Sequence, residues 1–477
     1  MNIALVFPHY SHRHRRFEED IDVVGREFGL MPPLGLAYAA AIMEQSGHTV
    51  IIIDANALRF SEEKTVKILR EFNPDLIGFM LTVWTFQLTL SWIKYIKRHL
   101  NAPILVGNIQ LQLYPEETFS HKEIDYGIIG SAQHSLPKLL SALEKNGSLE
   151  DIEGIVFRKN GKVVIHYPGS FYEDFNTLPF PARHLLPNQC YREVMSKRKN
   201  FTILMTSKGC PGKCSFCHIQ NTPYSCRSPV GVADEIEQCY RKYNIREIDI
   251  FDPSFTIDRQ RIIEICREIQ NRKLDIHFSC RARIDQVDEE LLAIMARTGF
   301  KKILYGIESG DQRILDTIKK GITIAQIQRA IVMTKAKGMK ALGFFLIGAP
   351  EDTVESVKKT IRFAEQLKVD YAQFHKVMAK PCTELYEQVK VIMKRDYWRE
   401  FVLGVAGEER LPSPWTGLTE KQIEDFTIRA YRSFYFRPGY LIDTLCNIKS
   451  FDEFARYARS AIGLMTVKSD VCFPVKG

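Results

Sequence analysis

The sequence predicts an α/β protein with an N-terminal Rossmann-like domain, a central partial (β/α)6 barrel of the TIM type and a C-terminal helical region. Short apolar runs alternate with amphipathic segments over residues 1–145 and again over 198–385. Near-continuous apolar strands separated by helices are typical of parallel sheets that are covered on both faces. Residues 146–197 are expected to hold a hairpin and a linker, and 386–477 are helical in pattern. At about 150 residues per domain, this length suggests roughly three domains.

The composition is that of an ordinary folded protein. Apolar residues make up 45% and charged residues 26% of the 477 residues. The formal charge of +8, from 65 basic and 57 acidic residues, is too small to favour a nucleic-acid partner. No apolar run approaches the roughly 20 residues that cross a bilayer, and the N-terminus lacks the pattern of a signal peptide. Eleven cysteines without a secretory signal favour reduced thiols in the cytoplasm, some with metal or redox chemistry.

The first domain is predicted from short apolar runs with helical segments between them. The expected strands are 3–7, 49–53, 76–80, 104–106 and 126–129, and the expected helices include 34–45, 63–72 and 88–99. Glycines fall at strand or helix ends, where ligands gather in such sheets, but no Gly-x-Gly-x-x-Gly follows the first strand. We therefore expect a ligand other than a standard dinucleotide.

The central region is predicted to form an open barrel. A hairpin signal, Lys159-Asn160-Gly161, and a proline-rich extended linker at 178–183 precede it. The expected strands are 201–206, 247–251, 275–280, 302–305, 342–347 and 371–377, separated by helical segments such as 233–243, 259–272, 289–297 and 354–366. Six repeats are fewer than the eight that close a TIM barrel, so a partial barrel is inferred, with its active site at the carboxyl ends of the strands.

Three cysteines follow the first strand of that barrel. Cys210, Cys214 and Cys217 form a C-x3-C-x2-C pattern in a loop that also holds glycine and proline. Three thiolates can bind three irons of a [4Fe-4S] cluster and leave the fourth iron without a protein ligand. A structural zinc would need a fourth ligand such as His218, and an ordinary ferredoxin site would need Cys226. The open cluster is the favoured interpretation, with the three cysteines as the catalytic and metal-binding residues.

This loop resembles the signature of the radical S-adenosylmethionine superfamily, which also has an aromatic residue, here Phe216, just before the last cysteine. The resemblance continues along the later strands, in 281–285, 305–310, 343–351 and 379–386, with Cys382 where glycine is more usual. It implies that the unique iron binds the amino and carboxylate groups of S-adenosyl-L-methionine. Cleavage of the carbon–sulfur bond would then give a 5′-deoxyadenosyl radical that abstracts hydrogen from the substrate.

The same resemblance implies contacts to S-adenosylmethionine at the strand ends. A zwitterionic ligand needs a cation for its carboxylate and an acceptor for its ammonium or ribose hydroxyls. Arg283 and Glu308, the latter followed by Ser309, are expected to supply both, and Phe216 is expected to present backbone groups to the adenine. Asp252 is a further expected contact, because its segment replaces the Gly-Gly-Glu-Pro that is frequent in the family. The alternative is that Arg283 and Glu308 form structural ion pairs.

In the first domain, 31–38, 47–50 and Asp54 resemble the cobalamin-binding domain that precedes the barrel in one branch of this superfamily. The resemblance implies that loops after the third, fourth and fifth strands contact the cofactor through Leu81, Thr82, Gly107, Asn108, Gly130 and Ser131. Small residues let the backbone approach a nucleotide tail, and hydroxyls can hydrogen-bond to it. The alternative is a domain that keeps the fold and has lost the cofactor.

No histidine of this chain is expected to bind the cobalt. In the wider cobalamin family, an Asp-x-His-x-x-Gly motif after the first strand supplies a lower axial histidine. Residues 20–25 match this spacing, but Asp22 occupies the histidine position, while His9, His12 and His14 lie in the same loop.

The resemblance implies an enzyme that methylates or otherwise functionalises an unactivated carbon of a small molecule, with an external electron donor such as flavodoxin or ferredoxin. A radical cyclase or rearrangement enzyme is an alternative, because 431–438 resemble the anaerobic magnesium-protoporphyrin cyclase and hopanoid-modifying branch, which suggests an apolar, polycyclic or lipid-like substrate. A tRNA methylthiotransferase would normally carry a second cysteine triad near the N-terminus, whereas the first cysteine here is Cys190. A non-catalytic iron–sulfur protein would bind iron without cleaving S-adenosylmethionine.

Overall fold

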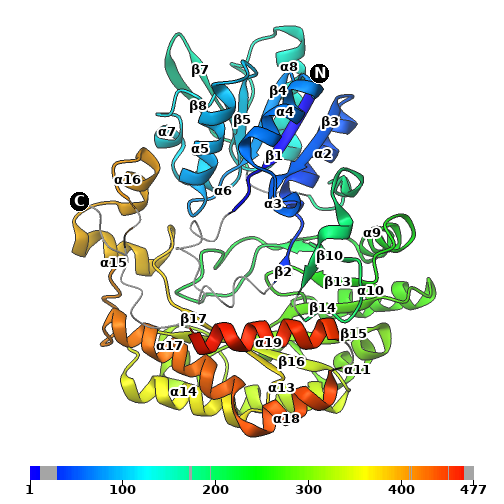
Figure 1. Cartoon of the computed structure of the whole chain (residues 1–477), viewed down its shortest axis with the longest axis vertical. Coiled ribbons are helices and arrows are strands. Elements are labelled where there is room, and N and C mark those ends of the chain that lie inside the picture. Colours follow the sequence, from blue (N-terminus) through cyan, green and yellow to red (C-terminus); the bar gives the residue numbers. More distant parts are fainter. Residues whose placement is uncertain are drawn as a thin grey trace.

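Two largely parallel sheets organise the molecule, one in the upper part of Figure 1 and one in the lower part. The computed structural model describes residues 1–10, 29–170, 174–193, 195–407, 409, 411–448 and 451–466. These residues confirm the predicted fold class, an N-terminal Rossmann-like domain followed by a partial barrel and a C-terminal helical region.

The first sheet has the strand order β3-β1-β4-β5-β6-β7-β8. Its strands are β1 (Asn2–Phe7), β3 (Thr49–Asp54), β4 (Leu76–Met80), β5 (Ile104–Gly107), β6 (Tyr126–Ile128), β7 (Ile155–Lys159) and β8 (Lys162–His166). The strands from β3 to β6 in this order run parallel, and the order reverses between β1 and β4. In doubly wound sheets, ligands bind at the carboxyl ends of the strands at such a reversal.

Helices cover both faces of this sheet. Ile3 and Leu5 of β1 belong to one core with α2 (Leu34–Gln45) and α8 (Ala132–Lys145). Ala4 and Val6 belong to the other core with α4 (Glu62–Phe72) and α5 (Phe86–Lys97). Because successive side chains of a strand point to opposite faces, burial of both faces requires the continuous apolar runs seen in the sequence.

The predicted hairpin forms and extends the first sheet. β7 pairs with β8 across a turn in which Asn160 has φ 51° and Gly161 has φ 77°. Positive φ at both central positions is typical of a type I′ hairpin turn. β7 also pairs antiparallel with β6, so the sheet continues beyond residue 145. The sequence predicts connecting structure here, because the local pattern of a hairpin does not reveal its partner strand.

The second sheet contains parallel strands in chain order: β10 (Phe201–Leu204), β13 (Glu247–Ile250), β14 (His277–Ala282), β15 (Phe300–Glu308), β16 (Lys340–Ile347) and β17 (Tyr371–Lys376). The helices between them are α9 (Pro229–Lys242), α10 (Arg259–Asn271), α11 (Glu289–Thr298), α12 (Gln312–Thr317), α13 (Ile324–Ala336) and α14 (Val354–Gln366). Several begin at a side chain that caps the helix, such as Asp258, Asp288 and Thr353. The sheet stays open between β10 and β17, as six repeats predict.

Alternate residues divide this sheet into an outer face and a concave face. The Tyr305 hydroxyl of β15 lies 2.8 Å from the Thr334 hydroxyl of α13, in the outer core. Its neighbour Leu304 packs instead with Leu342 and Tyr371 in a separate cluster on the concave face. The concave face is therefore lined by its own set of side chains.

The C-terminal helices take two positions. α15 (Glu384–Met393) and α16 (Tyr397–Leu403) lie between the barrel and the first domain (Figure 1). α17 (Glu420–Tyr435) packs along the edge strand β17, where the Tyr435 hydroxyl donates to Ala372 O at 2.8 Å and accepts from Ala372 N–H at 3.2 Å. α18 (Pro438–Asn447) and α19 (Phe451–Thr466) follow, and α19 crosses in front of β16. Among the described residues, no helix has the length and apolar character needed to span a membrane.

Candidate functional site

The three cysteines lie in a loop that follows the carboxyl end of β10. A short antiparallel ladder, β11 (Ser207–Lys208) with β12 (Ser225–Cys226), closes the base of this loop. Gly209 starts the loop at φ 81°, and a Cβ there would lie 1.9 Å from the carbonyl oxygen of Pro223. Only glycine fits this position, which fixes where the cysteine loop begins.

Asp252 anchors the strand end below the loop. Its carboxylate accepts hydrogen bonds from the backbone N–H groups of Thr206 and Ser207, at 2.6 and 3.1 Å, and from their hydroxyls, at 2.5 and 2.7 Å. Burial raises the pKa of Asp252, although these hydrogen bonds oppose the shift. Its carboxylate is fully buried and engaged in this way, so Asp252 positions the loop, and its expected contact with a cofactor stays a prediction.

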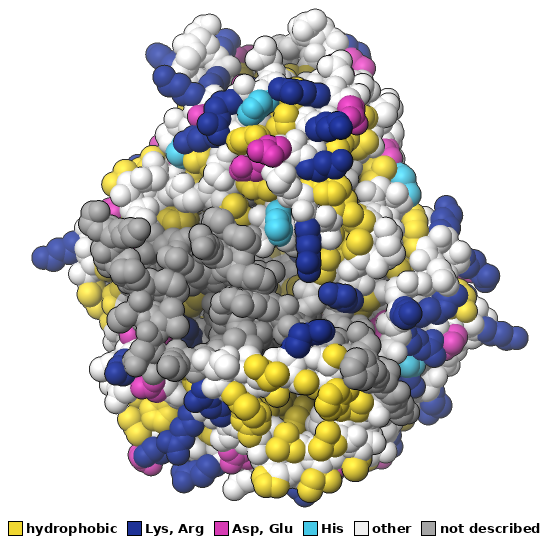
Figure 2. Space-filling model, viewed as in Figure 1, with side chains coloured by type: hydrophobic (Ala, Val, Ile, Leu, Met, Phe, Trp, Pro, Cys, Tyr) yellow, Lys and Arg dark blue, Asp and Glu magenta, His cyan; other side chains and the backbone are white. Residues whose placement is uncertain are grey.

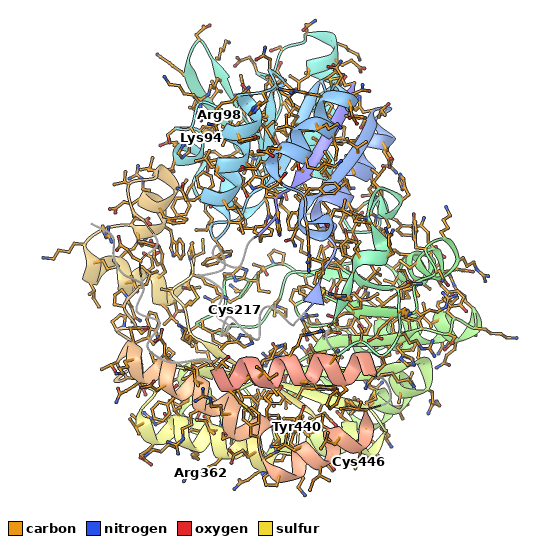
Figure 3. The ribbon with its side chains drawn as sticks, viewed as in Figure 1. Lys94, Arg98, Cys217, Arg362, Tyr440 and Cys446 are labelled. Atoms are coloured by element: carbon orange, nitrogen blue, oxygen red, sulfur yellow. The ribbon has the colours of Figure 1, made fainter. Side chains whose placement is uncertain are left out.

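Hydrogen bonds fold the loop around its cysteines. Thr222 N–H donates to Cys210 O at 3.0 Å, and the Thr222 hydroxyl accepts from Cys210 N–H at 2.9 Å. Gly212 N–H donates to the Cys210 sulfur at 3.4 Å, and Cys217 N–H donates to Cys214 O at 3.0 Å. Figure 3 shows Cys217 in the middle of the molecule, between the barrel and the first domain.

The thiols are at least partly buried and have cations nearby. Burial raises the pKa of Cys214 above its ordinary value, whereas the charges of Lys320 and Arg283 lower it. Burial also raises the pKa of Cys217, and the neighbouring Cys214 and Cys210 add to this shift. Three neighbouring thiolates repel one another, so bound iron and the nearby cations would stabilise them.

These cysteines are not arranged around a single metal ion. Within the described ranges, no group of three or more His, Cys, Asp or Glu side chains is placed to hold one metal ion. A cubane cluster makes a different demand, because each cysteine binds a different iron.

Arg283 lies just after β14 and borders the cysteine loop. Its guanidinium makes two hydrogen bonds to Asp285, at 2.9 and 3.0 Å, and Nη2 also donates to Lys320 O at 2.9 Å. A Cβ on Gly212 would lie 3.7 Å from Arg283 Nη1 and 3.3 Å from the Cys210 sulfur. Asp285 therefore holds the guanidinium beside the loop.

Glu308 ends β15 in a conformation that is uncommon outside glycine. Its φ is 69°, and the pairing of β15 with β16 shifts register between Gly306 and Glu308. Glu308 Oε1 lies 2.6 Å from Lys320 Nζ, and the two side chains are only 8% and 7% exposed. A Cβ on Gly306 would lie 2.5 Å from this carboxylate oxygen and 2.7 Å from the ammonium. Such strain persists where the surroundings impose it, often at functional sites.

Lys320 is a residue that sequence analysis missed. Its backbone carbonyl accepts from Arg283, its ammonium pairs with Glu308, and its charge acts on Cys214. Arg283 and Glu308 thus both form ion pairs, as the alternative interpretation expected, but with different partners. No motif marks Lys320, because it enters the site from the turn after α12.

Ser309 and Phe216 take supporting positions. The Ser309 hydroxyl lies 3.0 Å from the Thr360 hydroxyl of α14 and accepts from Asp311 N–H at 3.1 Å. Ser309 is 2% exposed and so ties the end of β15 to α14. Phe216 is half-buried against the core of the barrel.

The loops after β4, β5 and β6 form the carboxyl edge of the first sheet. Leu81 is fully buried, and its N–H donates to Gly107 O at 2.9 Å, which joins the loops after β4 and β5. The hydroxyls of Thr82 and Ser131 hold the starts of α5 and α8. Gly130 has φ 79°. Small residues and backbone therefore make up much of this edge.

Asn108 occupies an unusual backbone conformation on the same edge. Its φ is 93° and its ψ is −177°, a region that is essentially restricted to glycine. The side chain is exposed. The loop after β5 therefore places an exposed residue with a strained backbone at the edge where ligands of such sheets bind.

Other expected elements of the cobalamin site are placed only in part. His12, His14 and Asp22 lie outside the described residues, whereas His9 lies in the described segment that follows β1. Asp54 is fully buried, accepts from the Tyr191 hydroxyl at 2.7 Å and caps the short helix after β3.

Comparisons with known proteins identify both domains. The B12 binding domain model matches residues 22–140, and the Radical SAM superfamily model matches 204–364. The chain is 32% identical over 418 residues to an uncharacterized methyltransferase, PH0819, of Pyrococcus horikoshii, covering 86% of this chain and 89% of that protein. It is 27% identical over 374 residues to the anaerobic magnesium-protoporphyrin IX monomethyl ester cyclase of Rubrivivax gelatinosus, covering 76% of this chain and 67% of that protein.

A solved structure supports the fold. The radical S-adenosylmethionine methyltransferase TsrM from Kitasatospora setae, solved with cobalamin and a [4Fe-4S] cluster bound, matches with a TM-score of 0.64 at 20% identity. The match covers 82% of this chain and 75% of that chain. Taken with the domain matches and the Pyrococcus relative, it shows that the chain belongs to the radical S-adenosylmethionine superfamily, in the branch with an N-terminal B12-binding domain.

Proposed function

We propose that this protein is a cobalamin-dependent radical S-adenosylmethionine enzyme that transfers a methyl group to an unactivated carbon of a small molecule. The observation that carries this proposal is that the carboxyl edges of the two sheets meet at one buried side chain. Trp398 of α16 lies 5.0 Å from the ring of Trp84, in the loop after β4, and its indole N–H donates at 3.0 Å to Ala379 O, in the segment after β17. A cofactor on the first edge and a cluster on the second would therefore lie on either side of the junction between the two sheets.

Further contacts of α16 hold the two domains together. Asp396, at the start of this helix, accepts from the Tyr386 hydroxyl at 2.6 Å and from the Tyr114 hydroxyl of the first domain at 3.4 Å. Arg399 pairs with Glu117 of the first domain at 2.5 Å. The helix therefore sets the separation between the two edges.

The residues present fit the cofactors that the family implies, a [4Fe-4S] cluster, S-adenosyl-L-methionine and cobalamin. Cys210, Cys214 and Cys217 supply three ligands, and Glu308 with the cations of Arg283 and Lys320 supplies the groups that a zwitterion needs. The small residues Gly107 and Gly130 and the exposed Asn108 suit a large ligand on the first edge. When bound, these groups supply a 5′-deoxyadenosyl radical and a methyl donor.

In this proposal, residues of the chain bind S-adenosylmethionine and orient it. Glu308 and Lys320 already pair in the absence of a ligand, so neither buried charge is left uncompensated. An ammonium group of S-adenosylmethionine can take the place of Lys320 at Glu308, and Lys320 and Arg283 can then serve its carboxylate. The reaction also needs electrons from an external donor such as flavodoxin or ferredoxin, and we place it in a reducing compartment such as the cytoplasm.

Anaerobic reconstitution tests this function. The wild type should bind about four irons and four sulfides, and the triple variant Cys210→Ala, Cys214→Ala and Cys217→Ala should bind none while it still binds cobalamin. With dithionite, the wild type should convert S-adenosylmethionine into 5′-deoxyadenosine and methionine. With S-adenosylmethionine that carries a deuterated methyl group, the label should appear in a product formed in a candidate extract.

Two results would contradict the proposal. A full cluster in the triple variant would show that other residues bind the iron. Absence of 5′-deoxyadenosine from fully reconstituted wild type would exclude the radical chemistry. The cyclase alternative, which the Rubrivivax relative favours, predicts S-adenosylmethionine cleavage with a rearranged product that carries no label.

A further inference from the structure

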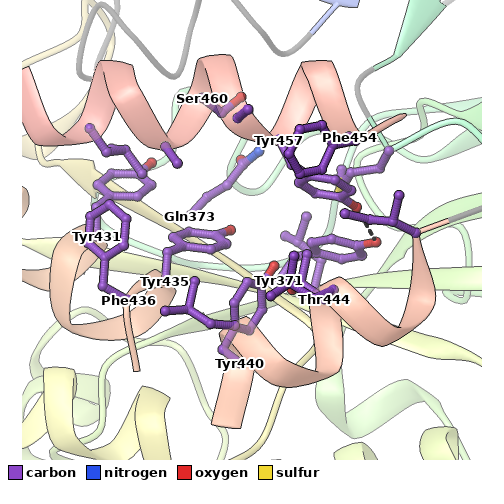
Figure 4. Close-up of a pocket in the computed structure, with 18 residues that line it drawn as sticks. Tyr371, Gln373, Tyr431, Tyr435, Phe436, Tyr440, Thr444, Phe454, Tyr457 and Ser460 are labelled. Carbon is purple, nitrogen blue, oxygen red and sulfur yellow. Dashed lines mark hydrogen bonds between the residues drawn. The ribbon is translucent and has the colours of Figure 1, made fainter. Parts of the chain in front are cut away.

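A cavity of about 310 Å³ lies on the concave side of the barrel. It is enclosed by β16 and β17 on one side and by α17, α18 and α19 on the others (Figure 4). None of the described residues that line it belongs to the cysteine loop or to the group formed by Arg283, Glu308 and Lys320. The function proposed above therefore leaves this cavity without a role.

The cavity occupies the open side of the half-barrel. Tyr371 and Gln373 are alternate residues of β17, and Tyr371 shares a cluster with Leu342 on the concave face. Met195, from the segment that leads to β10, completes the lining. α19 closes the space from outside, where the Tyr457 hydroxyl lies 3.5 Å from the Tyr371 hydroxyl and Arg432 of α17 donates to Leu464 O at 3.0 Å.

The lining selects an uncharged ligand. Of the 18 described lining residues, none is charged and seven are tyrosine or phenylalanine. Some of the tyrosine hydroxyls are already used, since Tyr435 bonds to the backbone of Ala372 and Tyr371 contacts Tyr457. A charged group placed here would lose its hydration without gaining a partner of opposite charge, whereas apolar surface would gain from burial.

Gln373 supplies a polar contact. Its side chain projects into the cavity in Figure 4, and it makes no hydrogen bond to the residues that the structure describes. An amide offers both donors and an acceptor. One polar atom of an otherwise apolar ligand can therefore be oriented there.

An exposed apolar surface borders the cavity. Leu441 and Leu445 of α18 and Phe454 of α19 line the cavity and are still 41%, 62% and 47% exposed. Figure 2 shows hydrophobic side chains gathered over this lower face of the molecule. Exposed apolar patches of this kind mark places where apolar partners or ligands enter.

We propose that this cavity binds the apolar part of the substrate, an uncharged hydrocarbon chain or fused-ring system that enters between α18 and α19. This inference rests on the proposed function, because that function requires the reacting carbon of the substrate to lie at the carboxyl edge of the barrel. Three residues of β17 lead from Gln373 to the strand end at Lys376, a rise of about 10 Å. A substrate with its apolar end in the cavity therefore needs a part of about this length to bring its reacting carbon to the carboxyl edge of the barrel.

The test uses the full-length reconstituted protein and two uncharged fluorescent probes, methyl cis-parinarate for a chain and dehydroergosterol for a fused-ring system. Ala461→Trp on α19 fills the cavity, whereas Arg459→Trp adds the same side chain at an exposed position of the same helix. We expect wild type and Arg459→Trp to bind at least one probe saturably and Ala461→Trp to bind it at least tenfold more weakly. Ala461→Leu is a milder variant that should weaken binding in the same direction.

The outcomes separate this inference from the proposed function. Iron content and substrate-free formation of 5′-deoxyadenosine are measured on the same samples. Intact cleavage without saturable binding of either probe would overturn the cavity inference alone, as would wild-type affinity in both Ala461 variants or equal loss in Arg459→Trp. Saturable binding that Ala461→Trp abolishes would support the cavity even if S-adenosylmethionine cleavage failed.

Discussion

The carboxyl edges of the two sheets are built in different ways. At the barrel edge, side chains fix individual positions: Asp252 accepts four hydrogen bonds, and Glu308 and Lys320 form a buried ion pair. At the edge of the first sheet, Gly107 ends β5, Gly130 lies in the loop after β6, and the exposed Asn108 has φ 93°. We propose from this difference that the barrel edge binds single ligand atoms through side chains, whereas the first edge holds a large ligand by its shape.

Gly209→Ala disrupts the cysteine loop at the barrel edge, and we expect it to have the largest effect on cluster binding and stability. The added Cβ would lie 1.9 Å from Pro223 O at a residue with φ 81°. We expect loss of most cluster iron and a fall in unfolding free energy of about 3 kcal/mol or more, because overpacking adds to the cost of a left-handed alanine. Iron and sulfide analysis after reconstitution and denaturant unfolding would measure both effects.

Gly161→Ala is the matched control for that variant. Gly161, in the turn between β7 and β8, has φ 77° but no atom within 4 Å of an added Cβ. It should therefore report the conformational cost alone, about 1 kcal/mol, with full iron content. If Gly209→Ala and Gly161→Ala show the same stability and iron content, the close contact of Gly209 with Pro223 does not determine the structure of the cysteine loop.

Glu308→Gln tests whether Glu308, at the barrel edge, contacts S-adenosylmethionine. Removal of the charged acceptor should weaken S-adenosylmethionine binding by about 1.5–3 kcal/mol, which is roughly ten- to a hundredfold in affinity. Glu384→Gln is the control, because it breaks the neighbouring exposed pair with Lys319 at 3.0 Å and should leave affinity unchanged. Anaerobic titration calorimetry would measure both, and wild-type affinity in Glu308→Gln would show that Glu308 does not contact this ligand.

Features encoded within one segment could be predicted from the sequence, and features that join distant segments could not. The parallel strands follow from local apolar runs and the cysteine loop from three residues within 210–217. Lys319 and Lys320 show the limit, since they are adjacent and alike in sequence. Lys319 is 53% exposed beside Glu384, whereas Lys320 is 7% exposed beside Glu308, because the turn after α12 folds back onto β15.

The same limit applies to other parts of the molecule. The pairing of β7 with β6 and the cavity under α19 depend on long-range packing, so local patterns do not reveal them. The position of Asp252 was predicted at a strand end, but its four hydrogen bonds depend on the neighbouring strand β10. The contacts of Arg283, Phe216 and the first-domain loops with cofactors stay predictions.

Asp352 is a further buried side chain that fixes the backbone at the barrel edge. Its protonation makes the stability of this edge depend on pH. Its carboxylate, just before α14, accepts from the backbone N–H groups of Gly348 and Ala349, at 3.0 and 2.9 Å, and from the Ser356 hydroxyl at 2.6 Å. Burial raises the pKa of Asp352 to about 6, although these hydrogen bonds oppose the shift. The folded protein therefore binds this proton more tightly than the unfolded chain does.

The sign of the effect follows from that raised pKa. The contribution of Asp352 to stability is fully present below its ordinary pKa near 4 and is lost as the pH rises through about 6. The unfolding free energy of wild type minus that of Asp352→Asn should fall by about 2 kcal/mol between about pH 4 and pH 7. Urea unfolding at a series of pH values would measure this difference, and a difference independent of pH would contradict the role given to burial.

Asn108→Gly tests the first edge and should have the smallest effect. Asparagine at φ 93° and ψ −177° is strained by about 1–3 kcal/mol, and glycine removes this strain while it increases the freedom of the unfolded chain by about 0.4–1 kcal/mol. We expect a net gain of about 1 kcal/mol in unfolding free energy, and a loss in Asn108→Ala, because alanine tolerates positive φ less well than asparagine. If this edge holds cobalamin through its backbone, Asn108→Gly should change the affinity less than threefold in an absorbance titration. A loss of more than tenfold would mean that the Asn108 side chain contacts the cofactor, so that both edges hold their ligands by side chains and the difference between them disappears.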